Sequence, residues 1–142
     1  MLFRSPTRML RFELIRDSAG PGHHRGGLGI RREYVNLAPA RFSIRSTKHV
    51  IPPSGIEGGE SGRAGRVVAY AGTGRQRELP TRYGDLPLRR GDRVVLETPG
   101  GGGCGPASRR DPLAVVEDLR DGYVTEPAAR ERYGLRDGGR TQ

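Results

Sequence analysis

The sequence lacks several features that mark common classes of protein. Tryptophan is absent, and the single cysteine, Cys104, excludes an internal disulfide framework and a cysteine-based zinc finger. No apolar run approaches the roughly 20 residues that a membrane-spanning helix requires. The amino terminus has no apolar segment like that of a secretory signal peptide. We therefore expect a cytoplasmic protein that does not cross a membrane.

Lysine is also nearly absent, because Lys48 is the only lysine among 25 basic residues. The net charge is +9, of which residues 1–50 carry +7 and residues 51–142 carry only +2. Such a charge is compatible with nucleic-acid binding, which would weaken steeply with salt. An arginine-rich chain is also what GC-rich codon usage produces. A small nucleic-acid-binding protein is therefore the alternative hypothesis and not the favoured one.

What the chain does contain predicts a mostly β fold. Its 142 residues suit one small domain, and 33% hydrophobic residues with 23 glycines and 11 prolines predict a thin core. Alternating apolar residues over 10–14 indicate a half-buried strand. Further strands are expected at 30–37, 41–45, 67–70 and 93–98, with a loop at 52–65 and residues 86–88 leading into a turn. Short antiparallel strands of this kind favour a sandwich or a barrel-like domain.

Two helix-start signals follow the strands, so the fold class is α+β with two short C-terminal helices. Asp111 suits an N-cap and Pro112 a first helical position. The same signal recurs at Thr125, and Gly134 suits the end of the second helix. The first helix is expected to present an apolar stripe of Leu113, Val116 and Leu119 and to end at Gly122.

These patterns divide the chain into four parts. Residues 1–8 are expected to be a disordered start, and residues 9–105 a β-rich domain with glycine loops. Residues 106–135 form the helical segment, and residues 136–142 a disordered tail.

Four consecutive glycines, Gly100, Gly101, Gly102 and Gly103, form the most unusual motif. Ordering glycine costs more backbone entropy than ordering any other residue, so such a run indicates close backbone approach or positive φ. The run lacks the Gly-Lys-Ser/Thr ending of a phosphate-binding P-loop. We expect Thr98–Gly105 to be an ordered structural turn between the last strand and the first helix.

Candidate metal ligands are scattered rather than clustered. His23 and His24 are adjacent, so in an extended chain they should point to opposite faces. No helical spacing connects them with Asp17 or His49, so we expect no metal site and solvent-facing histidines. Cys104 has no histidine at a diagnostic spacing that would lower its pKa, so we expect an inert thiol.

Motifs of a known family occur in the same order along nearly the whole chain. The most specific are Arg25-Gly26-Gly27-Leu28-Gly29 and Thr98–Gly103. The remaining motifs are 11–14, 17–22, 32–34, 52–59, 62–66, 91–94, 110–112 and 133–134. From about Arg8 to Leu135 the chain resembles the C-terminal region of the hydantoinase B/5-oxoprolinase family. That family includes N-methylhydantoinase B subunits and the related acetone carboxylase subunits.

The sequence departs from the family pattern in two residues and in length. Ala19 stands where glycine is usual, and Cys104 where tyrosine is usual, so Cys104→Tyr should be tolerated. Family members are several times longer, which implies that this chain is a fragment, a split gene product or a truncated gene. The metal ligands of the family are expected in the missing upstream part, so no catalytic residue is assigned here.

The resemblance implies an ATP-dependent hydrolase that opens cyclic amides such as hydantoin or 5-oxoproline. ATP and a divalent metal are implied for the complete enzyme, and neither is expected to bind this chain. The implied partners are the missing upstream part and an ATP-binding hydantoinase A-like subunit or domain. Alone, the chain should be inactive, or serve only as a structural docking module.

Two sets of residues are candidates for a site. Arg25 is the residue most suspected of touching an anionic group, because a guanidinium can bind phosphate or carboxylate through two parallel hydrogen bonds. Its alternative is an ion pair with Asp17. Gly26, Gly27, Gly29 and the run Gly100–Gly103 are expected to shape or buttress the site.

Overall fold

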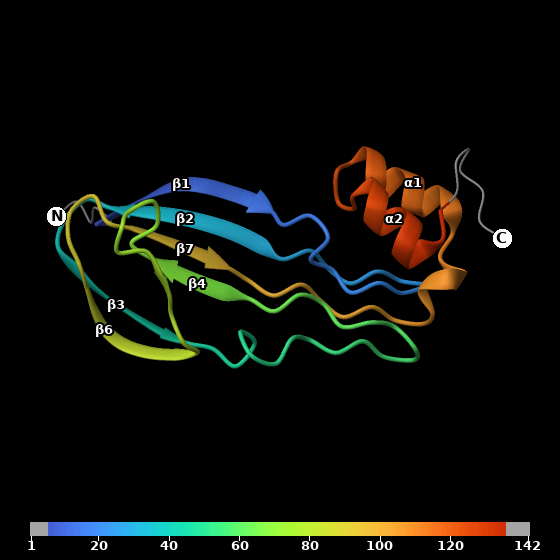
Figure 1. The fold of residues 1–142 in the computed structure, drawn as a ribbon, viewed down its shortest axis with the longest axis horizontal. Coiled ribbons are helices and arrows are strands. Elements are labelled where there is room, and N and C mark those ends of the chain that lie inside the picture. Colours follow the sequence, from blue (N-terminus) through green and yellow to red (C-terminus); the bar gives the residue numbers. More distant parts are fainter. Residues whose placement is uncertain (1–5, 136–142) are drawn as a thin grey trace, which may run out of the picture.

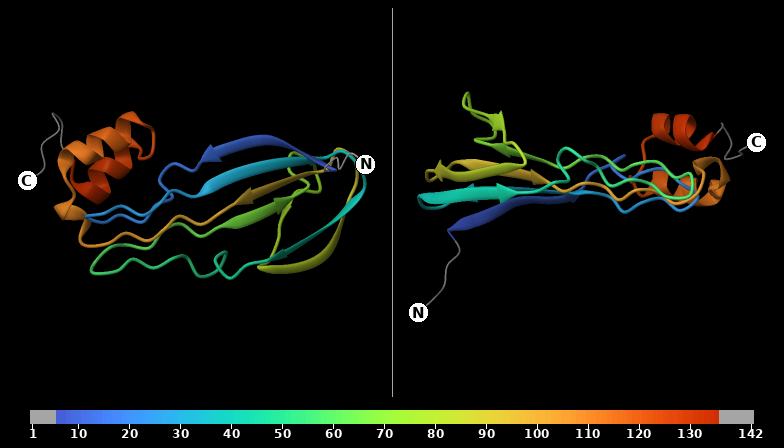
Figure 2. Two further views of the ribbon diagram at one scale, coloured as in Figure 1. Left: turned by 180° about the vertical axis from the view of Figure 1, so that it is seen from behind. Right: turned by 90° about the horizontal axis from the view of Figure 1, so that it is seen from below.

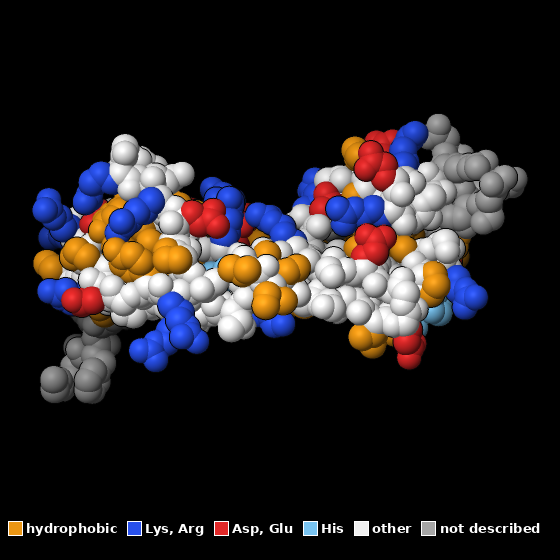
Figure 3. Space-filling view, turned by 60° about the horizontal axis from the view of Figure 1, so that its bottom comes forward, with side chains coloured by type: hydrophobic (Ala, Val, Ile, Leu, Met, Phe, Trp, Pro, Cys, Tyr) orange, Lys and Arg blue, Asp and Glu red, His pale blue; other side chains and the backbone are white. Residues whose placement is uncertain are grey.

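The computed structural model describes residues 6–135, which form an elongated molecule (Figure 1). Strands gather at one end and two helices at the other, and long extended segments connect them in both further views (Figure 2). The space-filling view shows a hollow between these two ends (Figure 3).

The described strands pair antiparallel in two sheets. One sheet has the order β1-β2-β7-β4-β5 and the other consists of β3 and β6. The strands are β1 (Thr7–Leu14), β2 (Ile30–Asn36), β3 (Ala40–Arg45), β4 (Arg66–Ala69), β5 (Arg77–Glu78), β6 (Arg82–Leu88) and β7 (Arg93–Glu97). A 3-10 turn at Ala107–Arg109 leads to helices α1 (Pro112–Arg120) and α2 (Glu126–Tyr133). The predicted mostly β fold with two C-terminal helices is confirmed.

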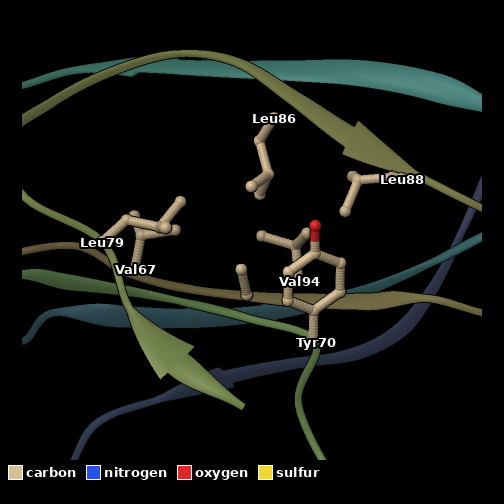
Figure 4. Packing of buried hydrophobic residues seen from close by; sticks show 7 residues of the cluster. Val67, Tyr70, Leu79, Leu86, Leu88 and Val94 are labelled. Atoms are coloured by element: carbon tan, nitrogen blue, oxygen red, sulfur yellow. The ribbon is translucent and has the colours of Figure 1, made fainter. Parts of the chain in front are cut away.

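The main core lies between the two sheets, where β6 packs over β4 and β7 (Figure 4). Leu86 of β6 and Val67 of β4 are fully buried there. The Tyr70 hydroxyl donates a hydrogen bond to the Pro87 carbonyl at 2.8 Å, which ties the layers together. The buried members of this cluster are Val67, Ala69, Tyr70, Leu79, Leu86, Leu88 and Val94.

Strand β6 was not predicted, because Pro87 between two leucines indicated a segment that leads into a turn. In the structure Leu86 and Leu88 alternate toward the core while Pro87 is exposed between them. Proline is tolerated in this place because β6 is an edge strand of a two-stranded sheet and need not donate on both sides. The short β5 was also missed.

The first strand is longer than expected and is not half-buried. Strand β1 includes Thr7 and Arg8, which were assigned to a disordered start; residues 1–5 and 136–142 lie outside the described residues. Phe12 is 57% exposed and Leu14 51%. β1 is the edge of its sheet, and the second sheet packs over β4 and β7 instead. The apolar face of β1 is therefore uncovered.

The capping residues of the helices are those predicted from the sequence, whereas the buried face of α1 is not the predicted one. Asp111 accepts a hydrogen bond from the Leu113 N–H at 2.9 Å, and Gly134 ends α2 with φ of 68°. The predicted stripe is wrong, because Leu113 is 70% exposed while Val115 and Asp118 are buried. α1 turns this face inward because Asp118 is ion-paired beneath it and Val115 packs on α2. No helix among residues 6–135 is long and apolar enough to span a membrane.

Candidate functional site

Three glycine-rich segments, 17–29, 53–65 and 98–105, lie side by side between the sheets and the helices (Figures 1 and 2). Segments 17–29 and 53–65 each run out and back, whereas 98–105 runs in one direction. We call these three segments the glycine clasp. The 98–105 segment is bonded to both of the others: the Gly101 N–H donates to the Gly27 carbonyl at 2.8 Å, and the Gly103 N–H to the Glu60 carbonyl at 2.9 Å. The Arg63 N–H donates to the Ser18 carbonyl at 2.8 Å. Backbone hydrogen bonds thus tie all three segments together.

Most glycines of the clasp occupy positions that no other residue could fill. A Cβ at Gly100 would lie 1.8 Å from the Ser18 carbonyl oxygen, and a Cβ at Gly102 2.0 Å from that of Ser54. At Gly26 the corresponding distance, to the Gly101 oxygen, is 2.1 Å. The same restriction to glycine governs the crowded axis of collagen. Gly29 and Gly103 are similarly crowded, whereas Gly27 has nothing within 4 Å.

The glycine run does not form the predicted turn. Thr98–Gly103 is extended, and within 98–105 only Gly105 has positive φ, at 72°. Close approach, and not a left-handed backbone, is therefore what requires glycine here. The segment is straight because its N–H groups alternate between two flanking segments, and a turn would remove those partners.

The glycine run does not fit a nucleotide. A phosphate cradle needs backbone N–H groups that are free to point at the ligand. Here the N–H groups already donate to backbone carbonyls at Thr98, Gly100, Gly101, Gly103, Cys104 and Gly105. Within residues 6–135, no three His, Cys, Asp or Glu side chains gather as metal ligands would.

Arg25 anchors the clasp to the first helix. Its Nε and Nη2 donate to the two carboxylate oxygens of Asp118 at 3.0 Å each, and its Nη1 donates to the Gly26 carbonyl at 2.9 Å. Arg110 reaches the same carboxylate at 2.7 Å. Asp118 is only 6% exposed, so two arginines compensate one buried charge.

The alternative pairing of Arg25 with Asp17 is wrong. Asp17 instead accepts a hydrogen bond from the Thr125 N–H at 2.8 Å, at the start of α2. Contact of Arg25 with an external anion stays a prediction, and that contact would require the pair with Asp118 to open.

The histidines lie differently from the expectation. The rings of His23 and His24 are 4.3 Å apart instead of facing opposite ways, because the chain bends at Gly22–His23 before His24 pairs with Cys104. Both are exposed as predicted, whereas His49 is partly buried and its Nδ1 is buried without a hydrogen-bond partner.

Cys104 lies beside a carboxylate and not beside a base. Its thiol donates to Glu57 Oε2 at 3.6 Å. Desolvation by burial, followed by the negative charge of Glu57, raises the pKa of the Cys104 thiol. A protonated thiol is a poor nucleophile, which supports the interpretation of Cys104 as inert. Tolerance of Cys104→Tyr stays a prediction.

A buried carboxylate at the entrance to the clasp was missed by sequence reasoning. Glu97, at the end of β7, is 2% exposed. It accepts hydrogen bonds from Arg66 Nε at 2.7 Å and Arg63 Nη2 at 2.9 Å. The strand register places Glu13, Arg31, Glu97 and Arg66 in one row across β1, β2, β7 and β4. Opposite charges alternate along this row, and only the pairing of four strands brings them together.

Burial and the neighbouring arginines shift the pKa of Glu97 in opposite directions. Desolvation is the largest single influence and raises it, but the hydrogen bond from Arg66 and the charges of Arg66, Arg63 and Arg31 together hold the pKa below its ordinary value. The hydrogen bond to Glu97 likewise raises the pKa of Arg66 against the effect of burial. Both partners therefore stay charged.

Comparison with known proteins identifies the family. The family model for hydantoinase B/oxoprolinase matches residues 3–107, most of the chain. This chain belongs to the hydantoinase B/oxoprolinase family. It is 31% identical to the caprolactamase subunit beta of Pseudomonas jessenii, over 92% of this chain and 23% of that protein. It is 33% identical to a 5-oxoprolinase of Pestalotiopsis fici, over 89% of this chain and 9% of that protein.

Two solved structures contain the same fold. The crystal structure of the ATP-dependent caprolactamase from Pseudomonas jessenii superposes with a TM-score of 0.82 and 28% identity, over 96% of this chain and 24% of that one. An acetone carboxylase in its nucleotide-free form gives a TM-score of 0.71 at 21% identity, over 92% and 22%. This hydantoinase B/oxoprolinase chain thus spans about a quarter or less of the relatives that it matches.

The crowding at the clasp predicts that substitutions of two glycines, Gly102 and Gly27, will differ in their effect on folding stability. Gly102→Ala should cost about 3 kcal/mol or more of folding stability, because its methyl group would overlap a backbone oxygen that cannot move alone. Gly27→Ala should change the stability by no more than about 0.5 kcal/mol, because that position is open. Urea unfolding followed by circular dichroism measures both. Equal losses in the two variants would contradict the account.

The Glu97 cluster predicts how stability depends on pH. Because the folded pKa of Glu97 lies below its ordinary value of 4.5, the carboxylate stabilises the fold above that value. This contribution is lost as the pH falls through the folded pKa. Glu97→Gln should therefore cost about 1–2 kcal/mol at pH 7 and flatten the fall in stability below pH ~4.5. Glu131→Gln, on the exposed side of α2, is the matched control and should leave the acid profile unchanged.

Proposed function

We propose that this chain is a scaffold part of an ATP-dependent hydrolase that opens cyclic amides, such as hydantoin or 5-oxoproline. The observation that carries the proposal is the family match over residues 3–107. Two relatives are named for lactam substrates, caprolactamase and 5-oxoprolinase, and one is described as ATP-dependent. We place the enzyme in the cytoplasm, where ATP is available.

We assign the reaction centre to the parts of the family polypeptide that this chain does not span. The backbone N–H groups of Gly100, Gly101 and Gly103 are bonded within the clasp, and the buried carboxylates Glu97 and Asp118 are held by arginines. Neither group is available to move a proton or hold a metal in this arrangement. The chain alone is therefore proposed to be inactive, and ATP and a divalent metal to bind elsewhere.

The contribution of this chain is positional. Arg25 and Arg110 hold α1 against the clasp through Asp118, and Arg63 and Arg66 hold the clasp against the sheet through Glu97. A rigid connection between helices and sheets would keep the surfaces that meet the rest of the enzyme in register.

The proposed partners are the remainder of the family polypeptide and an ATP-binding subunit of the hydantoinase A type. One relative is named subunit beta, which is the name of one component of an assembly. The uncovered apolar face of β1, with Phe12 and Leu14, offers a contact surface for the remainder of the polypeptide. The family match makes the nucleic-acid alternative the less favoured one.

The test is ATP-dependent ring opening by the chain alone and by the chain assembled with these partners. The account predicts no turnover of hydantoin, 5-oxoproline or caprolactam by the chain alone, and turnover by the assembly only when ATP is present. Turnover by the lone chain would contradict the proposal.

A pair of variants tests the contact surface in the same assay. Phe12→Asp should weaken assembly and activity, because it places a charge on the proposed apolar contact. Leu113→Asp is the matched control: it introduces the same charge at a residue that is 70% exposed on α1, and activity should persist. Equal effects of the two variants would mean that β1 is not the contact.

A further inference from the structure

A groove of about 820 Å³ lies at the end of the β3–β6 sheet, where the Gly65 N–H of the clasp donates to the Lys48 carbonyl at 3.0 Å. Its size is within the range of small-molecule sites, roughly 300–1,000 Å³. Its lining combines basic and hydroxyl side chains: Ser43, Arg45, Ser46, Thr47, Lys48, Arg82 and Tyr83, with Ile44 and Gly84. In the space-filling view, which brings the lower side of Figure 1 forward, basic side chains project from this side of the molecule (Figure 3).

The basic residues of the groove are placed where they repel one another. Arg45 and Arg82 are directly opposite in the β3–β6 register, and like charges in such a pair destabilise a sheet. Lys48 follows three residues after Arg45 and lines the same groove. Among the described residues, no carboxylate lies within 4.0 Å of these three side chains. By contrast, Arg41 on the same strand is paired with Asp85.

We propose that this groove binds a multivalent phosphate, such as a polyphosphate or a phosphorylated small molecule. Three positive charges without a carboxylate partner around one groove favour a ligand with more than one negative charge over a singly charged anion. Arginine binds phosphate through paired hydrogen bonds, and lysine binds it as a point charge. The hydroxyls of Ser46 and Thr47 are further donors at the same groove. A bound polyanion would also relieve the repulsion between Arg45 and Arg82.

The sequence supplies a direct probe, because Lys48 is the only lysine. An amine-specific acetylating reagent can modify only Lys48 and the terminal amine, and mass spectrometry separates the two products. Tripolyphosphate should slow the acetylation of Lys48 about tenfold, because charge-assisted hydrogen bonds engage its ammonium, and should leave the terminal amine unaffected. Sodium chloride at matched ionic strength should give no such protection.

Variants identify the residues responsible. Arg45→Gln and Arg82→Gln should each lose most of the protection of Lys48, whereas Arg41→Gln, which removes the same charge outside the groove, should keep it. Without ligand and at low salt, Arg82→Gln should melt at a higher temperature than the wild type, because the repulsion with Arg45 is gone. This second readout shows that the variant is folded.

Three results would overturn the proposal. Equal protection by sodium chloride or equal loss in Arg41→Gln would mean that only the general ion atmosphere acts on Lys48. Protection by citrate as strong as that by tripolyphosphate would mean a carboxylate site instead. The measurement uses the full chain, in the assembled enzyme if the chain requires its partners for solubility.

Discussion

The contact between glycine α-carbons and backbone carbonyl oxygens is the constraint on which this molecule depends. The three segments of the clasp approach so closely that a Cβ at Gly100, Gly102 or Gly103 would lie 2.0 Å or less from a carbonyl oxygen of a neighbouring segment. Apolar side chains contribute little there, because the main core lies between the two sheets and a second cluster lies in the helices. Backbone hydrogen bonds across the clasp therefore connect two small cores that have no shared side chains.

Buried ion pairs fix the two ends of that connection. Glu97 immediately precedes the 98–105 segment and is held by Arg63 and Arg66, while Asp118 lies beyond it and is held by Arg25 and Arg110. The arginines on Asp118 come from distant parts of the chain, whereas those on Glu97 are three residues apart, at the end of the clasp and the start of β4. Removing either carboxylate would leave arginines unpaired at a junction, so these residues are better suited to specifying geometry than to chemistry.

The parts of the fold that could be predicted from the sequence are those marked by local signals, namely apolar patterns and capping residues. The strands predicted at 30–37 and 93–98 appear as β2 (Ile30–Asn36) and β7 (Arg93–Glu97). The capping residues Asp111, Thr125 and Gly134 correctly predicted both helices. Burial was predicted less well, because it depends on which surface each element meets. The alternation in β1 marks an apolar face that nothing in the described chain covers. On α1 the predicted apolar stripe is not the buried face, because the ion-paired Asp118 is buried there instead.

The candidate site was less predictable still. Glycine blocks were recognised as special, but a run of glycines is compatible with a turn, a phosphate loop or close packing, and only the neighbouring carbonyls decide among them. Arg25 was recognised and its partner was not, since 93 residues separate it from Asp118. The row of charges through Glu97 requires the pairing of four strands, of which only β1 and β2 are consecutive along the chain.

Native-state hydrogen exchange of the clasp amides tests the central claim most directly. If the clasp is the rigid connection, the amides of Gly101 and Gly103 should exchange as slowly as those of the core strand β7, because they open only when the molecule unfolds. Exchange of these two amides at the rate of an unstructured chain, with β7 still protected, would contradict the account.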